Sequence, residues 1–104
     1  MGYIYLWLQM VKKSQIPQSA LELIDYPSRF PLKVLGRQDA HFESVVLELV
    51  RLRCPQGAQI DATSRPSRNA KYTALTLTFT VYSRAQIEDI YQDLYQCEHV
   101  VMSL

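Results

Sequence analysis

The segment TALTLTFTV, at positions 73–81, constrains the fold more than any other part of the chain. Successive residues of a strand point to opposite faces of a sheet, so this alternation separates the side chains into two sets. One face takes the large apolar residues and the other takes the threonines. The first set is Leu75, Leu77, Phe79 and Val81, and the second is Thr76, Thr78 and Thr80. The pattern predicts a strand in a sheet with one face covered and the other open.

The remaining elements follow from periodicity and from breaking residues. Residues 29–37 alternate in the same way and predict a strand, with Pro31 near its start and Gly36 near its end. A further strand precedes a loop over residues 66–70, and residues 98–104 form a last strand. We expect Val100, Met102 and Leu104 to share one face of that last strand.

Two helices are predicted between these strands. An apolar stripe at helical spacing indicates a helix over residues 40–54, with Asp39 as its N-cap. A second helix covers residues 84–97, where Ser83 and Gln86 have the spacing of a capping box. The two stripes are Phe42, Val45, Val46, Leu49 and Val50 in the first helix, and Ile87, Ile90, Tyr91 and Leu94 in the second.

The element order is therefore strand, helix, strand, strand, helix, strand. Right-handed crossovers place both helices on the same face of a four-stranded antiparallel sheet. This is an α+β, ferredoxin-like βαββαβ plait. We expect one such domain over residues 19–104, with a short extra helix at its start, ended by Pro27. Residues 1–18 are predicted to be a flexible extension, of which residues 1–9 need not belong to the native protein because Met10 could be the start.

The net charge and the two cysteines limit the expected partners and the expected cellular compartment. The formal net charge of +1 gives no general reason to expect a nucleic acid or an anionic membrane as partner. Cys54 and Cys97 lie far apart in the sequence, and no secretion signal precedes the domain. We therefore expect a cytoplasmic protein with free, buried thiols.

Residues that could carry out catalysis do not form a recognisable set. His41 and His99 are isolated from cysteine or acidic residues at metal-ligand spacing, so no metal site is predicted. There is no phosphate-binding glycine loop and no nucleophile with a base at a typical spacing. We expect a non-enzymatic protein without a cofactor.

Two surfaces remain as candidates for binding. The open sheet face is predicted to carry Lys33, Leu35, Thr76, Thr78 and Thr80, and it is the expected interaction surface. Self-association through this face would give at most a weak homodimer, because Lys33 and Arg37 could face their own copies across a two-fold axis. The alternative is an RNA-binding module that uses the basic hairpin tip. The tip residues that could contact phosphates are Arg65, Arg68 and Lys71.

From about residue 21 to its end, the chain resembles the YbeD family of small bacterial proteins. The resemblance is carried by the segments LELIDYPSRFPLKVLG, SRPSRNAKYTALTLT and IYQDLYQCEHVVMSL, in this order. It implies the same plait, a likeness to the regulatory ACT-type domains of amino-acid-pathway enzymes, and a link to lipoate metabolism through gene neighbourhood. The biochemical function of the family is unknown, so the resemblance implies a regulatory or interaction module for an unidentified protein or small metabolite.

The likeness to ACT-type domains also implies a candidate effector site in the loop after the first strand. Such domains bind small molecules there, where a glycine lets the ligand approach the backbone. The corresponding residues here are Gly36, Arg37, Gln38, Asp39 and His41. His41 stands where a second glycine is usual, which is a departure from the ACT pattern.

Overall fold

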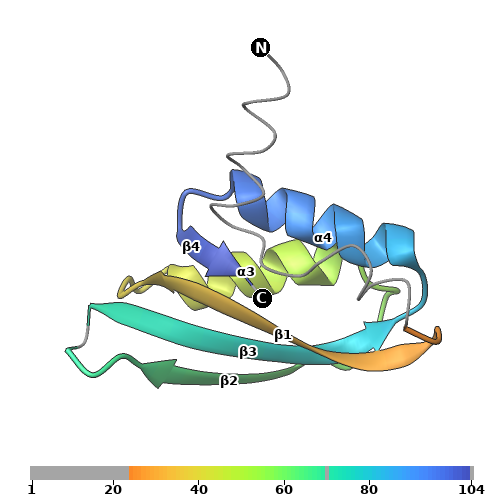
Figure 1. Ribbon diagram of the computed structural model, residues 1–104, viewed down its shortest axis with the longest axis horizontal. Helices are drawn as coiled ribbons and strands as arrows, with labels where there is room; N and C mark the ends of the chain where they lie inside the picture. Colours follow the sequence, from red (N-terminus) through yellow and green to blue (C-terminus); the bar gives the residue numbers. More distant parts are fainter. Residues whose placement is uncertain (1–23, 70, 104) are drawn as a thin grey trace, which may run out of the picture.

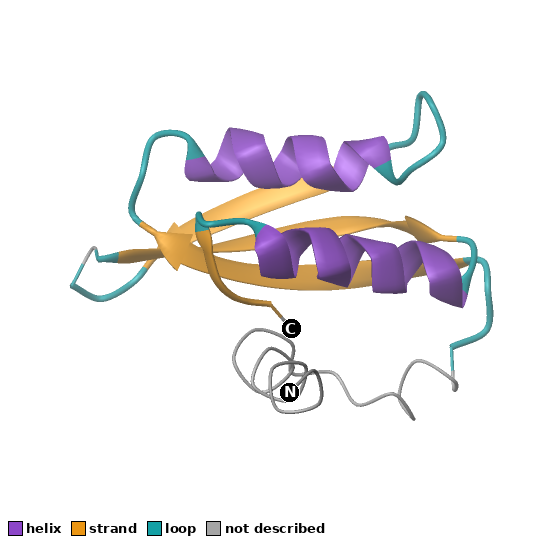
Figure 2. Ribbon diagram, turned by 90° about the horizontal axis from the view of Figure 1, so that it is seen from above, coloured by secondary structure: helices purple, strands orange, loops and turns teal. Residues whose placement is uncertain are grey.

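The computed structural model describes residues 24–69 and 71–103. Its strands are β1 (Ser28–Arg37), β2 (Asp61–Pro66), β3 (Tyr72–Val81) and β4 (Val100–Ser103). Its helices are α3 (Phe42–Leu52) and α4 (Arg84–Gln96). Figure 1 shows both helices on one side of the sheet, and Figure 2 shows them side by side across it. The predicted plait is confirmed.

The sheet has the order β2-β3-β1-β4, and every pairing is antiparallel. β1 and β3 pair along their whole lengths, with Leu32 opposite Leu77 and Lys33 opposite Thr76. β2 and β4 are the two edge strands. Because opposite residues share a face, this register places apolar side chains beneath the helices and leaves the threonines on the other side.

The core lies between the helices and the covered face of the sheet. Phe79, Leu77 and Leu32 are fully buried, and they meet the predicted apolar faces of both helices. The buried helical side chains are Phe42, Val46 and Val50 from α3, and Ile87, Ile90, Tyr91 and Leu94 from α4. The hydroxyl of Tyr91 is buried without a hydrogen-bond partner in the described part of the chain, and burial raises its pKa.

The helix starts agree with the sequence in one case and differ in the other. At α4, Ser83 Oγ accepts from the backbone N–H of Gln86 at 3.2 Å, as predicted. The Gln86 side chain reaches back to the N–H of Tyr82 rather than to that of Ser83. At α3, Asp39 is not the N-cap. The helix begins at Phe42 after His41, and Asp39 Oδ1 instead accepts from the His41 N–H at 2.9 Å.

The last strand corrects a second prediction. Its pairing with β1 is irregular between Leu35 and Gly36, where the register shifts. Val100 is buried, whereas Met102 pairs with Leu35 of the open face, so these two residues do not share a face as expected. A bulge inserts one residue into the alternation, and the sequence pattern alone does not reveal it. Leu104 lies outside the described residues.

Two further predictions concern the start of the chain and the burial of the two cysteines. Most of the predicted extra helix over residues 19–26 lies outside the described residues, as does the extension over residues 1–18, and residues 24–26 are not helical. Cys54 and Cys97 form no disulfide, as expected, but both are half-buried rather than buried. Burial raises the pKa of the Cys54 thiol.

The two faces of β3 should respond differently to truncation. We expect Phe79→Ala to lower the free energy of unfolding by roughly 3–5 kcal/mol, because it leaves a cavity in the core. Thr78→Ala, on the open face of the same strand, should cost less than about 1 kcal/mol. Urea denaturation of the two variants measures both values, and equal losses would contradict the assignment of faces.

Candidate functional site

The helices cover one face of the sheet and leave the other, open face uncovered (Figure 1). It carries the residues of β1 and β3 that alternate with the core, and the register adds one face of β2. Thr76, Thr78 and Thr80 are half-buried along its centre, as predicted. Lys33 is exposed beside them and Leu35 is half-buried. The register also places Asp61, Thr63 and Arg65 of β2, Arg29, Pro31 and Arg37 of β1, and Tyr72 of β3 on this face.

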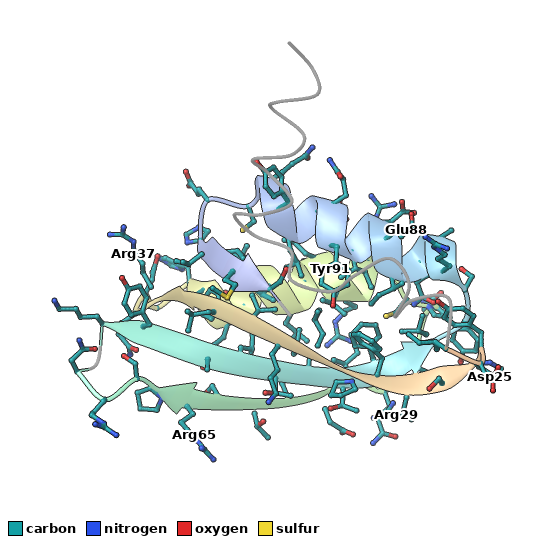
Figure 3. The ribbon with its side chains drawn as sticks, in the orientation of Figure 1. Asp25, Arg29, Arg37, Arg65, Glu88 and Tyr91 are labelled. Carbon is teal, nitrogen blue, oxygen red and sulfur yellow. The ribbon has the colours of Figure 1, made fainter. Side chains whose placement is uncertain are left out.

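Basic side chains dominate the charge of this face. Arg29 is held in place: its guanidinium contacts Asp61 Oδ2 at 2.7 Å and the carbonyl oxygens of Gln59 and Thr78 at 3.2 Å. The other cations of the face and of the hairpin tip form no ion pair with any described residue. They are Lys33, Arg37, Arg65, Arg68 and Lys71, and we call them the basic set. Figure 3 shows Arg29 and Arg65 on the side of the sheet away from the helices.

The helix layer has the opposite charge. Exposed carboxylates lie along α3 and α4, and Figure 3 shows Glu88 on the side opposite Arg65. The cations of this layer are largely neutralised: Arg53 contacts Asp93 at 2.7 Å and Asp89 at 3.7 Å, which raises the Arg53 pKa. The acidic residues of the helices are Glu43, Glu48, Glu88, Asp89 and Asp93. The chain is therefore nearly neutral overall but strongly polarised between its two layers.

A shallow, open hollow lies where β1 ends and β3 begins. It has a volume of about 450 Å³ and is lined by Arg37, Gln38, Lys71 and Tyr72. Two cations beside an aromatic ring and an amide suit a carboxylate or another small anionic group. The sequence interpretation included Arg37 and Lys71, but in separate candidate sites, and it missed Tyr72. The position of Tyr72 opposite Arg37 in the β1–β3 register is the signal that could have identified this residue.

Side chains of the hairpin between β2 and β3 give its tip a defined shape. Ser67 and Tyr72 are hydrogen-bonded across its base, with Ser67 N–H donating to the Tyr72 carbonyl at 2.8 Å. Tyr72 N–H donates to Ser67 Oγ at 3.1 Å, and Ser67 Oγ donates to Asn69 Oδ1 at 3.0 Å. Arg68 is exposed in this hairpin. Arg65 belongs to β2 instead and lies on the sheet face, so the three predicted phosphate contacts are spread along a surface.

In the candidate effector loop, the space beside Gly36 is filled by the protein itself and is not open to a ligand. A Cβ atom on Gly36 would lie 2.2 Å from Cε1 of Phe42 and 2.7 Å from the carbonyl oxygen of His99. No side chain fits at such distances. The space beside Gly36 is filled by a core ring and by the backbone before β4, so close packing explains the glycine without a ligand.

The polar residues of this loop are also used within the protein. Asp39 accepts from the His41 N–H with one oxygen and lies 3.1 Å from His99 Nδ1 with the other. The backbone hydrogen bond from His41 is the main cause that lowers the pKa of Asp39. Gln38 N–H donates to the Lys71 carbonyl at 2.9 Å, and Gln38 Oε1 accepts from the Thr73 hydroxyl at 2.6 Å. These contacts tie the loop to β3 and β4.

We expect Gly36→Ala to lower the free energy of unfolding by roughly 1–3 kcal/mol, because the added methyl group overpacks the Phe42 ring. Denaturant titration of Gly36→Ala, Phe42→Leu and the double variant would measure this cost. The two substitutions should be coupled, since the smaller side chain at position 42 makes room for the methyl group. A fully stable Gly36→Ala protein would contradict the packing explanation and favour ligand approach.

The described part of the chain shows neither a group of residues that could hold a metal ion nor a helix that could span a membrane. No group of three or more His, Cys, Asp or Glu residues there is arranged to hold a metal ion. Among the same residues, no helix is both long enough and apolar enough to cross a bilayer.

A family model, described as a protein of unknown function (DUF493), matches residues 21–104. Among curated relatives, a UPF0250 protein of Chromobacterium violaceum is 41% identical over 73 residues, which is 70% of this chain and 82% of the relative. A UPF0250 protein of Neisseria gonorrhoeae is 38% identical over 87 residues, covering 84% of this chain and 96% of the relative.

A solved structure supports the same fold. The solution structure of protein HP0495 from H. pylori matches with a TM-score of 0.63 and 23% sequence identity. The alignment covers 86% of this chain and 96% of that protein. At this identity the likeness shows the plait and carries no functional assignment.

Proposed function

Since this chain belongs to the DUF493 family of proteins of unknown function, we propose its function from its surface: the open face of the sheet binds an acidic partner protein. The separation of charge between the two layers carries this proposal. Lys33 and Arg37 form no ion pair with a described residue and stand beside the half-buried Leu35. A face with unpaired cations around an apolar patch favours a partner with carboxylates around an apolar contact.

The hollow at the end of the sheet gives the partner a point of attachment. Arg37 and Lys71 can surround one carboxylate, and Tyr72 can donate a hydrogen bond to it. The threonines alongside present methyl groups and hydroxyls to the partner without a strong charge. We infer that an aspartate or glutamate of the partner occupies the hollow and that the rest of the contact extends along β1 and β3.

The ACT-type mode of effector binding has less support. The space beside Gly36 is filled by Phe42, and both Gln38 and Asp39 are engaged by internal hydrogen bonds. Arg37 is the member of that loop that remains available, and it belongs to the hollow. A regulatory role is still compatible with protein binding. Proteins of lipoate metabolism are the first partners to test, because the family resemblance implies that link.

RNA binding is a second candidate, and Tyr72 is the observation that favours it. This half-buried ring lies on the open face next to Arg37 and Lys71, so it offers one base-stacking position beside phosphate-binding side chains. The centre of the face has threonines where RNA-recognition motifs have further aromatic rings. The protein partner is therefore the better-supported reading.

The experiment is an affinity capture from the native host with three versions of the full chain: wild type, Arg37→Glu/Lys71→Glu, and Arg51→Glu. The double variant reverses charge in the hollow, whereas Arg51 is an exposed cation on the last turn of α3. We expect the double variant to bind a captured acidic protein roughly tenfold or more weakly, and the Arg51 variant to bind it like wild type.

A nuclease treatment of the lysate separates the two candidates. Capture of an acidic protein should survive the treatment and weaken at high salt. If nuclease abolishes capture, RNA is the partner and the protein-binding proposal is wrong. Equal capture by all three versions would contradict the proposal that an acidic side chain of the partner occupies the hollow.

A further inference from the structure

One edge of the sheet is open to pairing. β2 is the terminal strand in the order β2-β3-β1-β4, and all of its residues are exposed. In the described part of the chain, no strand pairs with its outer side. Such an edge presents unpaired backbone donors and acceptors to any strand that approaches it.

The hydrogen-bonding pattern shows which residues of β2 face outward. Ser67 N–H donates to the Tyr72 carbonyl, so this pair bonds inward, toward β3. In an antiparallel ladder the bonded and non-bonded pairs alternate. Arg65, Thr63 and Asp61 therefore also bond to β3, which leaves the backbone groups of Ala62 and Ser64 pointing away from the sheet.

These outward groups are self-complementary about Thr63. If a second copy approaches antiparallel with its own Thr63 on the two-fold axis, Ala62 lies opposite Ser64 of that copy. Both residues have outward N–H and C=O groups, so each pair exchanges two hydrogen bonds. Registers shifted by one residue along β2 do not match outward groups with outward groups.

Charge selects the same register. With Thr63 on the axis, Asp61 lies directly opposite Arg65 of the second copy, and Arg65 opposite its Asp61. Opposite charges across an antiparallel pair are favourable, whereas a register shifted by two residues in either direction loses both pairs. The contact of Asp61 with Arg29 does not prevent this, because a carboxylate has about four acceptor positions.

The helix above this edge has an apolar flank of its own. Val45, Leu49 and Leu52 are spaced four and three residues apart, so they share one side of α3. Val45 and Leu49 are half-buried. Leu52 is 70% exposed and is one of two large hydrophobic residues that are exposed in the described structure.

The position of α3 directs this flank toward the β2 edge. Cys54 lies two residues past the end of α3, at a position that would continue the flank opposite Val45, and its Sγ accepts a hydrogen bond from Gln86 of α4 at 3.7 Å. α4 in turn packs against β4, at the far edge of the sheet. The flank that includes Leu52 therefore faces away from α4, on the side of β2.

We propose that two copies of this chain associate through their β2 strands, in the register that places Thr63 on the two-fold axis. The two sheets would then form one antiparallel sheet, and the two α3 flanks would meet above the junction. Because this axis is perpendicular to the sheet, both open faces lie on the same side. The dimer does not depend on the proposed acidic partner, but it would double the basic face offered to one.

Sedimentation equilibrium of the full chain, from roughly 10 µM to 1 mM, tests the proposal in a range suited to a small interface. We expect wild type to dimerise within this range. Arg65→Asp places like charges opposite each other twice and should raise the dimer dissociation constant by about tenfold or more. Arg68→Asp makes the same change of charge outside the paired segment and should dimerise like wild type.

Mixing two variants separates pairing from folding. Asp61→Arg presents only cations along β2, and Arg65→Asp presents only carboxylates, so each alone should remain monomeric while an equal mixture forms heterodimers. Ser64→Pro removes one outward N–H that β3 does not use, and it should weaken the dimer without unfolding the chain. A monomeric wild type, a dimer equally sensitive to Arg68→Asp, or a mixture that stays monomeric would each overturn the proposal.

Discussion

The antiparallel register between β1 and β3 is the constraint on which the rest of the structure depends. It places Leu32 against Leu77 under the helices and Lys33 against Thr76 on the open side. A shift of one residue would exchange these faces, burying lysine and exposing the core leucines, so the register is fixed by a large free-energy difference. The closure of the core by the helices, the exposure of the threonines and the collection of cations on one face all follow from it.

We interpret the separation of charge as functional because most cations on the sheet side have no ion-pair partner among the described residues. On the helix side, carboxylates and guanidiniums form ion pairs such as Arg53–Asp93. On the sheet side, Arg29 and Asp61 neutralise each other, and the remaining cations have no such partner among the described residues. Surface ion pairs contribute little to stability, so their absence costs the fold little. Their absence does leave the basic set available to a binding partner, whereas the loop after β1 is occupied by its own contacts.

The fold could be predicted because the local signals in the sequence agree with the arrangement of helices and strands in the whole domain. The alternation around Phe79 and the capping box at Ser83 each depend on near neighbours in the chain. The register of β4, where the prediction was wrong, is decided by distant residues, and so is the packing around Gly36. Gly36 is required by Phe42 and by the backbone at His99, and the register shift of β4 depends on its pairing with β1. Neither contact leaves a pattern in the local sequence.

The candidate site was only partly predictable for the same reason. The predicted basic tip and the predicted open face are two parts of one surface, which the register of three strands brings together. A net charge of +1 conceals the polarity, since the acidic helices cancel the basic sheet in the sum. Tyr72 was overlooked because it precedes the threonine alternation, although it lies opposite Arg37 in the sheet.

The most direct test of the central claim is a nuclear magnetic resonance titration of the labelled chain with a glutamate-rich peptide, with a lysine-rich peptide of equal length as control. The account predicts chemical-shift changes at Lys33, Arg37, Lys71 and Tyr72 that weaken at high salt, with little change along α4 and little response to the control peptide. Changes centred on Asp39 and His41, or on the helices, with the sheet face unaffected, would contradict it.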